Sequence, residues 1–275
     1  MPIGDYISIV AKSKKAKIIY KIFGTLDLHT HLRLKPLIRY FKSYFRKDHL
    51  NEIKILEIGC GSGVNMYEIY KIAKKFNQKF RYFGIDISLD SISAAEKVAQ
   101  IIVKENPKIA NINLVCADAQ EFLGHHLLNS TLKYDFILLI DVIEHIPYSM
   151  IFLKKIYELL DDTGKIIISV PTPLYPRIFG RKFASQIGHL VDGYTLETLD
   201  NLFSNIKCHR ILHVYNTGLI SNLGTFIYYR VVFNYKLLNF LKSILLYPFK
   251  YFDILNSKYL SCSLFCVYEK KDERS

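Results

Sequence analysis

The stretch that decides the fold is Ile53-Lys-Ile-Leu-Glu-Ile-Gly-Cys-Gly-Ser-Gly63, an apolar run that ends in three glycines at alternate positions. A helical pattern begins near Ser62, so the expected order is strand, glycine turn, helix. Glycine lacks a Cβ and tolerates positive φ, so the turn lets backbone approach a ligand, and the helix that follows points free N–H groups there. The G-x-G-x-G spacing differs from the dinucleotide fingerprint G-x-G-x-x-G. Because Glu57 precedes the first glycine by two positions, the turn favours a ligand with a cationic group over one with a pyrophosphate.

From residue 53 onward, predicted strands and helices alternate. Strands are expected at 53–58, 81–87, 112–117, 135–141, 165–171, 206–215 and 262–269, and helices at about 62–76, 90–104, 148–160 and 195–204. The strands are nearly continuous apolar runs, as expected for a parallel sheet that is covered on both faces. Alternating strands and helices with short turns predict a doubly wound α/β fold.

The two ends of the chain differ from this middle part. Residues 1–50 carry a net charge of +8 and residues 205–275 a net charge of +6, whereas residues 51–204 carry −2. We expect residues 1–50 to form a basic helical lid or extension, and residues 51–275 to form the α/β domain with an amphipathic, aromatic insertion at 216–260. Basic terminal segments on a near-neutral core favour binding to an anionic surface, either a membrane or a nucleic acid. The other interpretation is that these charges only keep the protein in solution.

Within the N-terminal part, residues 36–46 have an amphipathic pattern. Pro36 suits a first helical turn. The expected apolar face comprises Leu37, Ile38, Phe41 and Phe45, and the adjacent basic face comprises Arg39, Lys42 and Arg46. This pattern favours a lid helix packed on the core; a membrane-interfacial helix with a basic stripe is the alternative.

The five cysteines lack the spacing of a zinc site, and their odd number together with the absence of a signal-peptide pattern predicts a reducing cytosol. Apolar runs are too short or too polar to cross a bilayer, so peripheral membrane contact is the form of membrane association that we expect.

Four consecutive predicted strands carry an acid at or near their carboxyl ends, namely Glu57, Asp86, Asp118 and Asp141. In doubly wound sheets, ligands bind outside the carboxyl ends of the strands, where the strand order reverses. Asp86 is placed to accept hydrogen bonds from two ribose hydroxyls, and Asp118 to accept one from an adenine amino group. An acid-lined pocket suits a nucleoside with a positive group better than a polyphosphate.

These motifs resemble those of class I S-adenosylmethionine-dependent methyltransferases. The resemblance covers roughly residues 50–175 and rests on Leu56–Gly63, Gly84–Ser88, Cys116–Ala119, Tyr134–His145 and Leu159–Pro173. Asp141-Val-Ile-Glu-His145 is similar to the ubiquinone-biosynthesis branch of small-molecule methyltransferases. The resemblance implies a Rossmann-like, mostly parallel seven-stranded sheet with an antiparallel last strand, and S-adenosylmethionine as cofactor.

The resemblance also implies roles for particular residues. Gly59, Gly61 and Gly63 would pass close to the methionine part of the cofactor, with Glu57 supporting their loop. Asp86 would hold the ribose, Ile87 would touch the adenine, and Asp118 with Ala119 would bind the adenine edge; Asp141 would lie beside the methionine and the substrate.

Methyl transfer would be an in-line displacement at a sulfonium, for which the protein mainly supplies orientation and a dry site. If the acceptor is a hydroxyl, a base must take its proton. The candidates are His145 and His189, with structural roles as the alternative: His145 capping its helix and His189 pinning a loop. We expect no bound metal; the alternative, implied by relatives with a Glu-x-x-Glu-His motif, is a divalent ion on Asp141, Glu144, His145 and His189.

The expected function is therefore S-adenosylmethionine-dependent methylation, favoured at oxygen, of a small-molecule, lipid-linked or glycan-linked acceptor. The chain lacks an Asn/Asp-Pro-Pro-aromatic motif after the fourth strand and a cysteine in Val170-Pro-Thr-Pro173, which argues against methylation of base amines or of pyrimidine C5. Two alternatives remain: an RNA methyltransferase that grips its substrate with the basic ends, and a non-catalytic binding module of the same fold.

Overall fold

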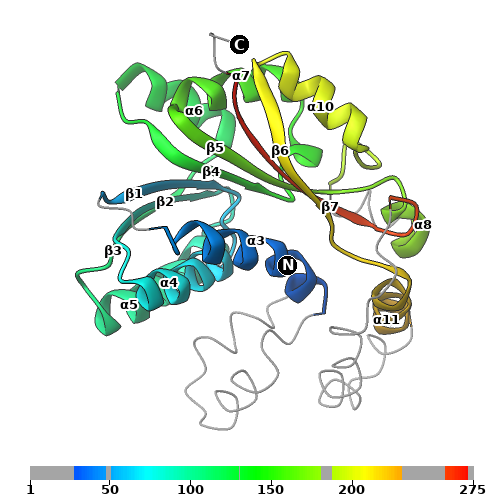
Figure 1. Cartoon of the computed structure of the whole chain (residues 1–275), viewed down its shortest axis with the longest axis horizontal. Helices are drawn as coiled ribbons and strands as arrows, with labels where there is room; N and C mark the ends of the chain where they lie inside the picture. Colours follow the sequence, from blue (N-terminus) through cyan, green and yellow to red (C-terminus); the bar gives the residue numbers. More distant parts are fainter. Residues whose placement is uncertain (1–27, 48–50, 130, 181–187, 231–257, 272–275) are drawn as a thin grey trace, which may run out of the picture.

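The structure is a computed structural model, and it describes residues 28–47, 51–129, 131–180, 188–230 and 258–271. Its centre is a seven-stranded sheet between two helical layers (Figure 1). The strands are β1 (Ile53–Ile58), β2 (Phe80–Asp86), β3 (Ala110–Cys116), β4 (Tyr134–Ile140), β5 (Leu160–Pro171), β6 (Cys208–Tyr215) and β7 (Ser263–Lys270).

The strand order is β3-β2-β1-β4-β5-β7-β6, and β7 runs antiparallel to both of its neighbours whereas the other pairs are parallel. The predicted fold class is therefore confirmed. The order reverses between β1 and β4, so the turn after β1 opens onto the crevice where ligands of such sheets bind.

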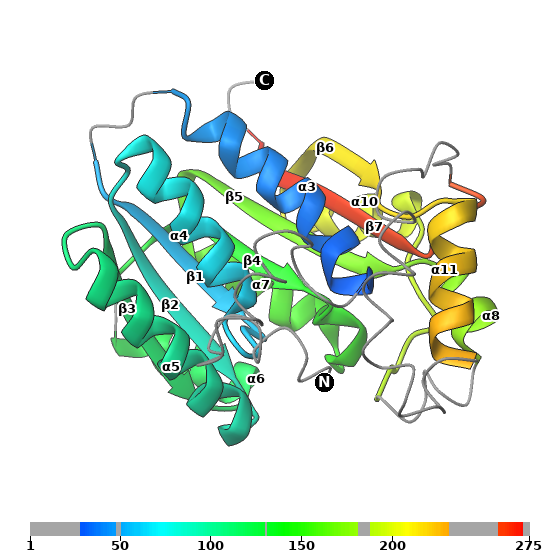
Figure 2. The same cartoon turned by 90° about the horizontal axis from the view of Figure 1, so that it is seen from below.

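Helices α3 (Leu28–Tyr44), α4 (Val64–Phe76) and α5 (Leu89–Glu105) cover one face of the sheet, and α6 (Ala119–Asn129), α7 (Ser149–Leu159) and α10 (Leu196–Ser204) cover the other (Figures 1 and 2). Two apolar cores result, one on each face. In β5, Ile167 packs in the first core, whereas Ile166 and Ile168 pack in the second. This double coverage explains why the central strands β1 and β4 are mostly apolar and buried, whereas the edge strand β6 is exposed along much of its length.

The prediction that the N-terminal helix starts near Pro36 is wrong, because α3 begins at Leu28 and Pro36 lies inside it. A proline in a helix interior costs roughly 3 kcal/mol. The burial of Leu32, Leu34 and Leu37, at about 1.5–3 kcal/mol per side chain, offsets that cost. The interpretation as a helix packed on the core is confirmed, since the Phe41 ring lies 5.1 Å from that of Phe136 in β4.

Sequence patterns did not predict α6 or the short helix α8 (Tyr175–Phe179). They also assigned no helix within the insertion. The structure shows α11 (Leu219–Arg230) there, in contact with α8. The rest of the insertion, 231–257, and residues 1–27 lie outside the described part of the chain. None of the described helices combines the length and hydropathy needed to cross a bilayer.

Candidate cofactor and acceptor site

The glycine turn after β1 has the backbone that the sequence predicts. Gly59, Gly61 and Gly63 have φ values of 72°, 54° and 78°, which side chains disfavour. A Cβ on Gly59 would lie 2.6 Å from the Cγ2 of Val142, so this position has no room for a side chain. The turn is thus shaped for close backbone approach at the carboxyl ends of β1 and β4.

Asp86 holds this turn from the end of β2. Its Oδ2 accepts the Gly61 N–H at 2.8 Å, and its Oδ1 accepts the Ser88 N–H at 2.9 Å. The residue is buried, with an exposed fraction of 6%. The carboxylate therefore has a structural role that sequence patterns did not suggest; its contact with a ribose remains a prediction.

Glu57 is a buried acid that joins three elements beneath the turn. Its carboxylate accepts hydrogen bonds from Asn65 in α4, at 2.5 Å, and from the Tyr82 hydroxyl in β2. Burial raises the pKa of Glu57 to about 7, although the bonds from Asn65 and Tyr82 act in the opposite direction; the nearby Asp86 charge raises it further. Sequence patterns missed both partners, because neither belongs to a motif.

The residues that are predicted to contact the adenine follow the carboxyl ends of β2 and β3. Ile87 follows β2 with 73% of its surface exposed, so its side chain is accessible to a ligand. Asp118 precedes α6, and its Oδ1 accepts the N–H groups of Gln120 and Glu121, which makes it the cap of that helix. Ala119 is the first residue of α6. Their contacts with adenine remain predictions.

Asp141 follows β4 in a left-handed conformation, with φ of 54°. Its N–H donates to the carbonyl of Ser169 in β5 at 2.8 Å. Its Oδ2 accepts a hydrogen bond from Nη1 of Arg33, which comes from α3. Strained residues of this kind cluster at ligand sites. Arg33 was not predicted to belong to the site, because 108 residues separate it from Asp141.

Glu144, His145 and His189 form a second cluster beside Asp141, with one potential ligand atom from each lying within 4.8 Å of the others. The Nδ1 of His145 lies 3.1 Å from the Gly188 carbonyl, which can only accept, so Nδ1 carries the proton and Nε2 is the basic nitrogen. The structure thus brings both predicted catalytic histidines together, with ring centroids 4.9 Å apart. The 188–190 segment is thus bonded to His145, and its Leu190 N–H also donates to the Glu144 carbonyl at 2.8 Å.

Glu144 is fully buried, and both of its carboxylate oxygens lack a hydrogen-bond partner among the described residues. The Nδ1 of His189 is likewise buried without a partner there. Burial raises the pKa of Glu144 well above its usual range, and the nearby Asp141 charge acts in the same direction. Unsatisfied buried polar groups are rare in structural positions. A carboxylate with two imidazoles is a donor set that suits a divalent transition metal.

Aromatic rings extend this cluster toward α8. Tyr175 stacks on Phe179 at 4.3 Å, and its centroid lies 5.3 Å from that of His189. Sequence patterns did not single out Tyr175, because the five-residue helix that carries it gives no periodic signal.

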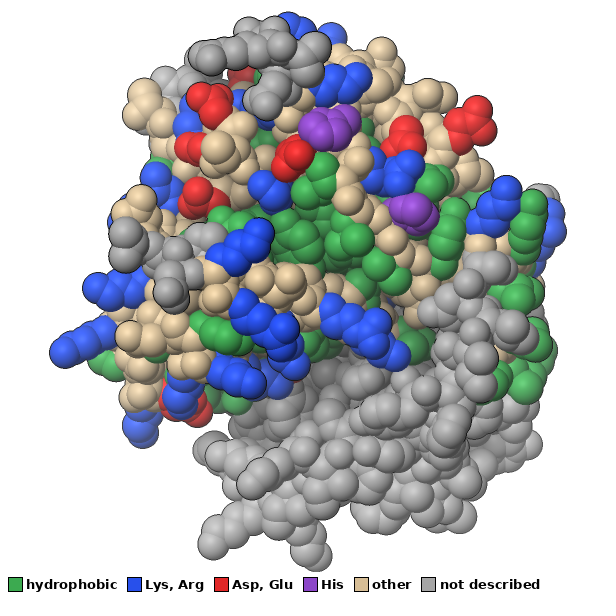
Figure 3. All heavy atoms as spheres, viewed as in Figure 1, with side chains coloured by type: hydrophobic (Ala, Val, Ile, Leu, Met, Phe, Trp, Pro, Cys, Tyr) green, Lys and Arg blue, Asp and Glu red, His purple; other side chains and the backbone are tan. Residues whose placement is uncertain are grey.

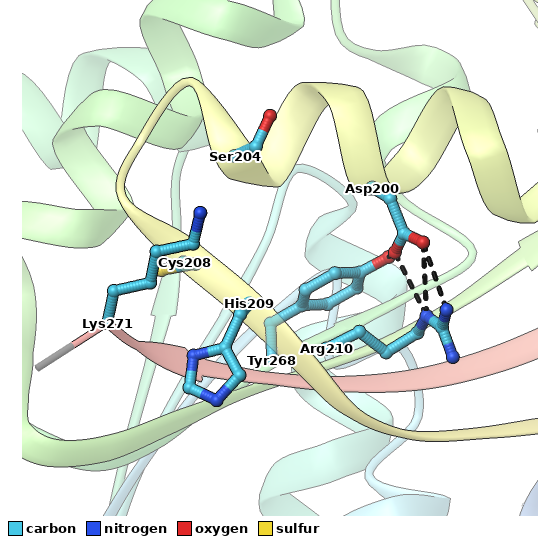
Figure 4. A pocket seen from close by; sticks show the side chains of 7 residues that line it. All are labelled: Asp200, Ser204, Cys208, His209, Arg210, Tyr268 and Lys271. Atoms are coloured by element: carbon cyan, nitrogen blue, oxygen red, sulfur yellow. Dashed lines mark hydrogen bonds and ion pairs between the residues drawn. The ribbon is translucent and has the colours of Figure 1, made fainter. Parts of the chain in front are cut away.

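A shallow pocket at the opposite edge of the sheet has a different character (Figure 4). Asp200 in α10 accepts hydrogen bonds from the Arg210 guanidinium at 3.0 Å and from the Tyr268 hydroxyl at 2.8 Å. The Tyr268 ring stacks on Phe203 at 3.8 Å. The polar groups here satisfy one another, so we interpret this cluster as structural.

Comparison with known proteins agrees with this geometry. A family model described as a methyltransferase domain matches residues 29–209. A ubiquinone biosynthesis O-methyltransferase of Rickettsia akari is 26% identical over 174 residues, which cover 63% of this chain and 59% of that protein. The chain spans about half the length of the curated relatives it matches, with shares such as 59% and 44%.

Two solved structures share the fold. The plantazolicin methyltransferase BamL, in complex with a triazolic desmethylPZN analog and SAH, has a TM-score of 0.56 and 15% identity, covering 98% of this chain and 95% of that one. The small RNA methyltransferase HEN1 has a TM-score of 0.57 and 14% identity, covering 89% of this chain and 26% of that one. Together with the family match and the sheet order, these findings show that the chain belongs to the methyltransferase domain family and has the class I fold.

Proposed function

We propose that the protein is an S-adenosylmethionine-dependent methyltransferase that methylates a hydroxyl oxygen of a small or lipid-linked acceptor. The observation that carries the proposal is the meeting of the glycine turn with the Glu57, Asp86 and Asp141 carboxyl groups at one edge of the sheet. The cofactor bears a sulfonium and an ammonium, so an acid-lined edge suits it. The relatives named O-methyltransferases of ubiquinone biosynthesis support oxygen as the acceptor atom.

In this mechanism the turn and the strand-end acids hold the cofactor so that its methyl group points along the line of attack. The neutral thioether is a good leaving group when the bond between methyl and sulfur breaks, and alignment supplies the main contribution of the protein. Asp86 binds the ribose while it fixes Gly61, Ile87 covers the adenine, and Asp118 with Ala119 lines its edge.

The Glu144–His145–His189 cluster then prepares the acceptor. His145 presents Nε2 as a base, because its Nδ1 proton is committed to the Gly188 carbonyl. His189 and Tyr175 border the same space and orient the acceptor. In the alternative with a divalent cation, Glu144, His145 and His189 would hold it, and the Nε2 of His145 would then be a ligand and not the base. When bound, the cation would act as a Lewis acid that lowers the pKa of the acceptor hydroxyl.

Two surfaces support contact with an anionic membrane that carries an amphiphilic acceptor. On α11, Leu219, Leu223 and Phe226 are 52%, 54% and 44% exposed, at a spacing that places them on one helix face. Arg39 and Lys42 in the C-terminal half of α3, and Arg46 just after it, are exposed; the N-terminal end of α3 is the end that lies toward α11 (Figure 2). Figure 3 shows lysine and arginine side chains spread over the part of this face where α3, α4 and α5 lie in Figure 1. An exposed apolar helix face on a protein that also presents basic side chains is typical of a peripheral membrane protein, and we propose that the protein lies in the cytoplasm at such a surface.

A label-transfer experiment tests the function. Purified protein is incubated with methyl-labelled S-adenosylmethionine and, separately, with a panel of phenols, a total lipid extract and total RNA. We expect label in the phenol or lipid fraction. Label confined to RNA would identify an RNA methyltransferase instead, and absence of both label and cofactor binding in folded protein would identify a non-catalytic module.

Vesicle flotation tests the membrane contact. We expect flotation with vesicles containing phosphatidylglycerol but not with pure phosphatidylcholine, and loss of flotation in R39E/K42E. K154E/K271E is the matched control, since it reverses two exposed charges outside that basic face, on α7 and just after β7. Equal flotation of all three proteins would contradict the membrane contact.

A further inference from the structure

Residues 188–194, here called the strap, have no regular secondary structure and carry His189 into the candidate site. The strap is hydrogen-bonded both to the turn η1 (Ile143–His145), which follows β4, and to the last residue of β5. A segment of this kind owes its position to particular contacts, because it has no hydrogen-bond ladder of its own. Those contacts decide where the groups of η1 point.

The first half of the strap is bonded to two consecutive residues of η1. The Gly188 carbonyl lies 3.1 Å from Nδ1 of His145, and the Leu190 N–H donates to the Glu144 carbonyl at 2.8 Å. The first of these contacts orients an imidazole and selects its tautomer, the role that a third group has beside many catalytic bases. The orientation of His145 therefore depends on where the strap lies.

The middle of the strap contributes little to holding it in place. Leu190 and Val191 are 61% and 40% exposed, so neither side chain is anchored in a core. Gly193, near the end, instead packs directly on backbone. Its φ is 148°, and a Cβ there would lie 2.3 Å from the carbonyl carbon of Thr172. The strap is thus fixed from its end and not from its middle.

Tyr194 makes the contacts that fix this end. Its N–H donates to the Pro171 carbonyl of β5 at 2.8 Å, and its hydroxyl donates to the Ile143 carbonyl of η1 at 3.3 Å. Its ring is buried in the second core, with an exposed fraction of 6%. Burial raises the pKa of Tyr194 to about 12, and the Glu144 charge acts in the same direction, so the hydroxyl remains a donor near neutral pH. One side chain therefore joins the strap, η1 and the core.

We propose that the strap is the positioning element of the base His145 and that Tyr194 is the residue that fixes the strap. This inference rests on the proposed function. The Tyr194 hydroxyl holds the strap against η1, so the Gly188 carbonyl stays in place and keeps the imidazole proton on Nδ1. The Nε2 of His145 is then free to accept the proton of the acceptor hydroxyl. When the hydroxyl of Tyr194 is removed, the two tautomers of His145 become comparable in population, and the fraction of protein with a competent base falls.

Tyr194→Phe tests this role, because it removes the hydroxyl and keeps the buried ring. With the panel of phenols as acceptors, we expect kcat to fall about 10-fold, since catalysis is sensitive to small displacements of the reacting groups. The KM of the acceptor and the affinity for S-adenosylhomocysteine should stay within about twofold. Y134F is the matched control, because Tyr134 lies in the same core and its hydroxyl is 3.3 Å from Nε2 of His126, at the far end of β4. Y134F should change neither kcat nor KM.

Nitrogen-15 NMR of the histidine side chains gives a readout that a merely structural role would not move. At about pH 8.5, where imidazoles are neutral, His145 of the wild type should be the Nδ1–H tautomer, and in Y194F it should be a mixture of both. H145Q assigns the signal by removing it. A double-mutant cycle adds a second readout: in the H145Q background, Y194F should cause no further loss of label transfer, because Tyr194 acts through His145.

Several results would overturn the inference: a wild-type His145 with its proton on Nε2, an unchanged tautomer or an unchanged kcat in Y194F, or an equal loss of rate in the H145Q background. Thermal melting shows whether Y194F is folded. If it is not, L190P, which removes the N–H bonded to the Glu144 carbonyl at an exposed position, must shift the tautomer, and an unchanged tautomer would overturn the inference. Wild-type protein that neither transfers label nor binds S-adenosylhomocysteine would overturn the proposed function, whereas the tautomer of His145 tests the strap separately.

Discussion

The two edges of the sheet differ in whether the polar groups there have hydrogen-bond partners. At the edge with the glycine turn, Glu144 is buried without a hydrogen-bond partner among the described residues, and Asp141 has a left-handed backbone. At the opposite edge, Asp200 receives hydrogen bonds from Arg210 and Tyr268 (Figure 4). Burial works against the Asp200 charge, but these bonds hold its pKa below the usual range. The unpartnered Glu144 and the strained Asp141 thus coincide with the place where a ligand is expected, whereas the charge of Asp200 is satisfied within its own cluster.

The largest effect is expected for Glu144→Gln, a variant at the edge with the glycine turn. The substitution keeps the shape of the side chain but removes its acid and anionic forms, so we expect methyl-label transfer to fall about a thousandfold, within the range of acid–base groups. Affinity for S-adenosylhomocysteine should remain within about twofold. The same variant should lose any protection by Mn²⁺ against thermal unfolding. Normal label transfer by E144Q would show that the cluster is not part of the chemistry.

The protonation of Glu57 should make the free energy of unfolding depend on pH. Its folded pKa of about 7 lies above the usual 4.5, so the folded state holds a proton that the unfolded state releases. Stability should therefore be fully present below about pH 4.5 and fall as pH rises to about 7, by roughly 3 kcal/mol. Denaturant unfolding of Glu57→Gln should lack this slope. An identical slope in the variant would assign the effect to another group.

Asp86→Ala should weaken binding of S-adenosylhomocysteine about a hundredfold, because it removes charge-assisted bonds both to the Gly61 N–H and to the predicted ribose. Titration calorimetry measures this loss. Asp90→Ala, an exposed acid in the first turn of α5, is the control and should bind normally. Unchanged affinity in folded D86A would mean that the ribose contact is misassigned.

The smallest effect should come from the opposite edge. Asp200→Asn should lower the free energy of unfolding by about 1 kcal/mol, because the ion pair with Arg210 is partly exposed and screened by solvent. Cofactor affinity and label transfer should be unchanged. Loss of cofactor binding in this variant would show that the two edges are coupled.

Local patterns were enough to predict most of the sheet. Each strand is a short apolar run between turn residues, and the glycine turn with its positive φ values follows from spacing alone. The placement of Asp86 and Asp141 at one edge also follows, because the carboxyl ends of parallel strands meet there. Helix α3 was misplaced because Pro36 is a local stop signal that long-range packing of Leu32, Leu34 and Leu37 overrides.

The sequence by itself determined the order of the strands, the glycine turn and the row of acids, since each depends on neighbours along the chain. Tertiary structure decided which groups share a space: Arg33 with Asp141, His145 with His189, and Glu144 with no partner among the described residues. These relations depend on how α3 and the 188–190 segment pack against the end of β4. Periodicity carries no information about contacts between segments that are distant in the chain, so only the folded chain reveals them.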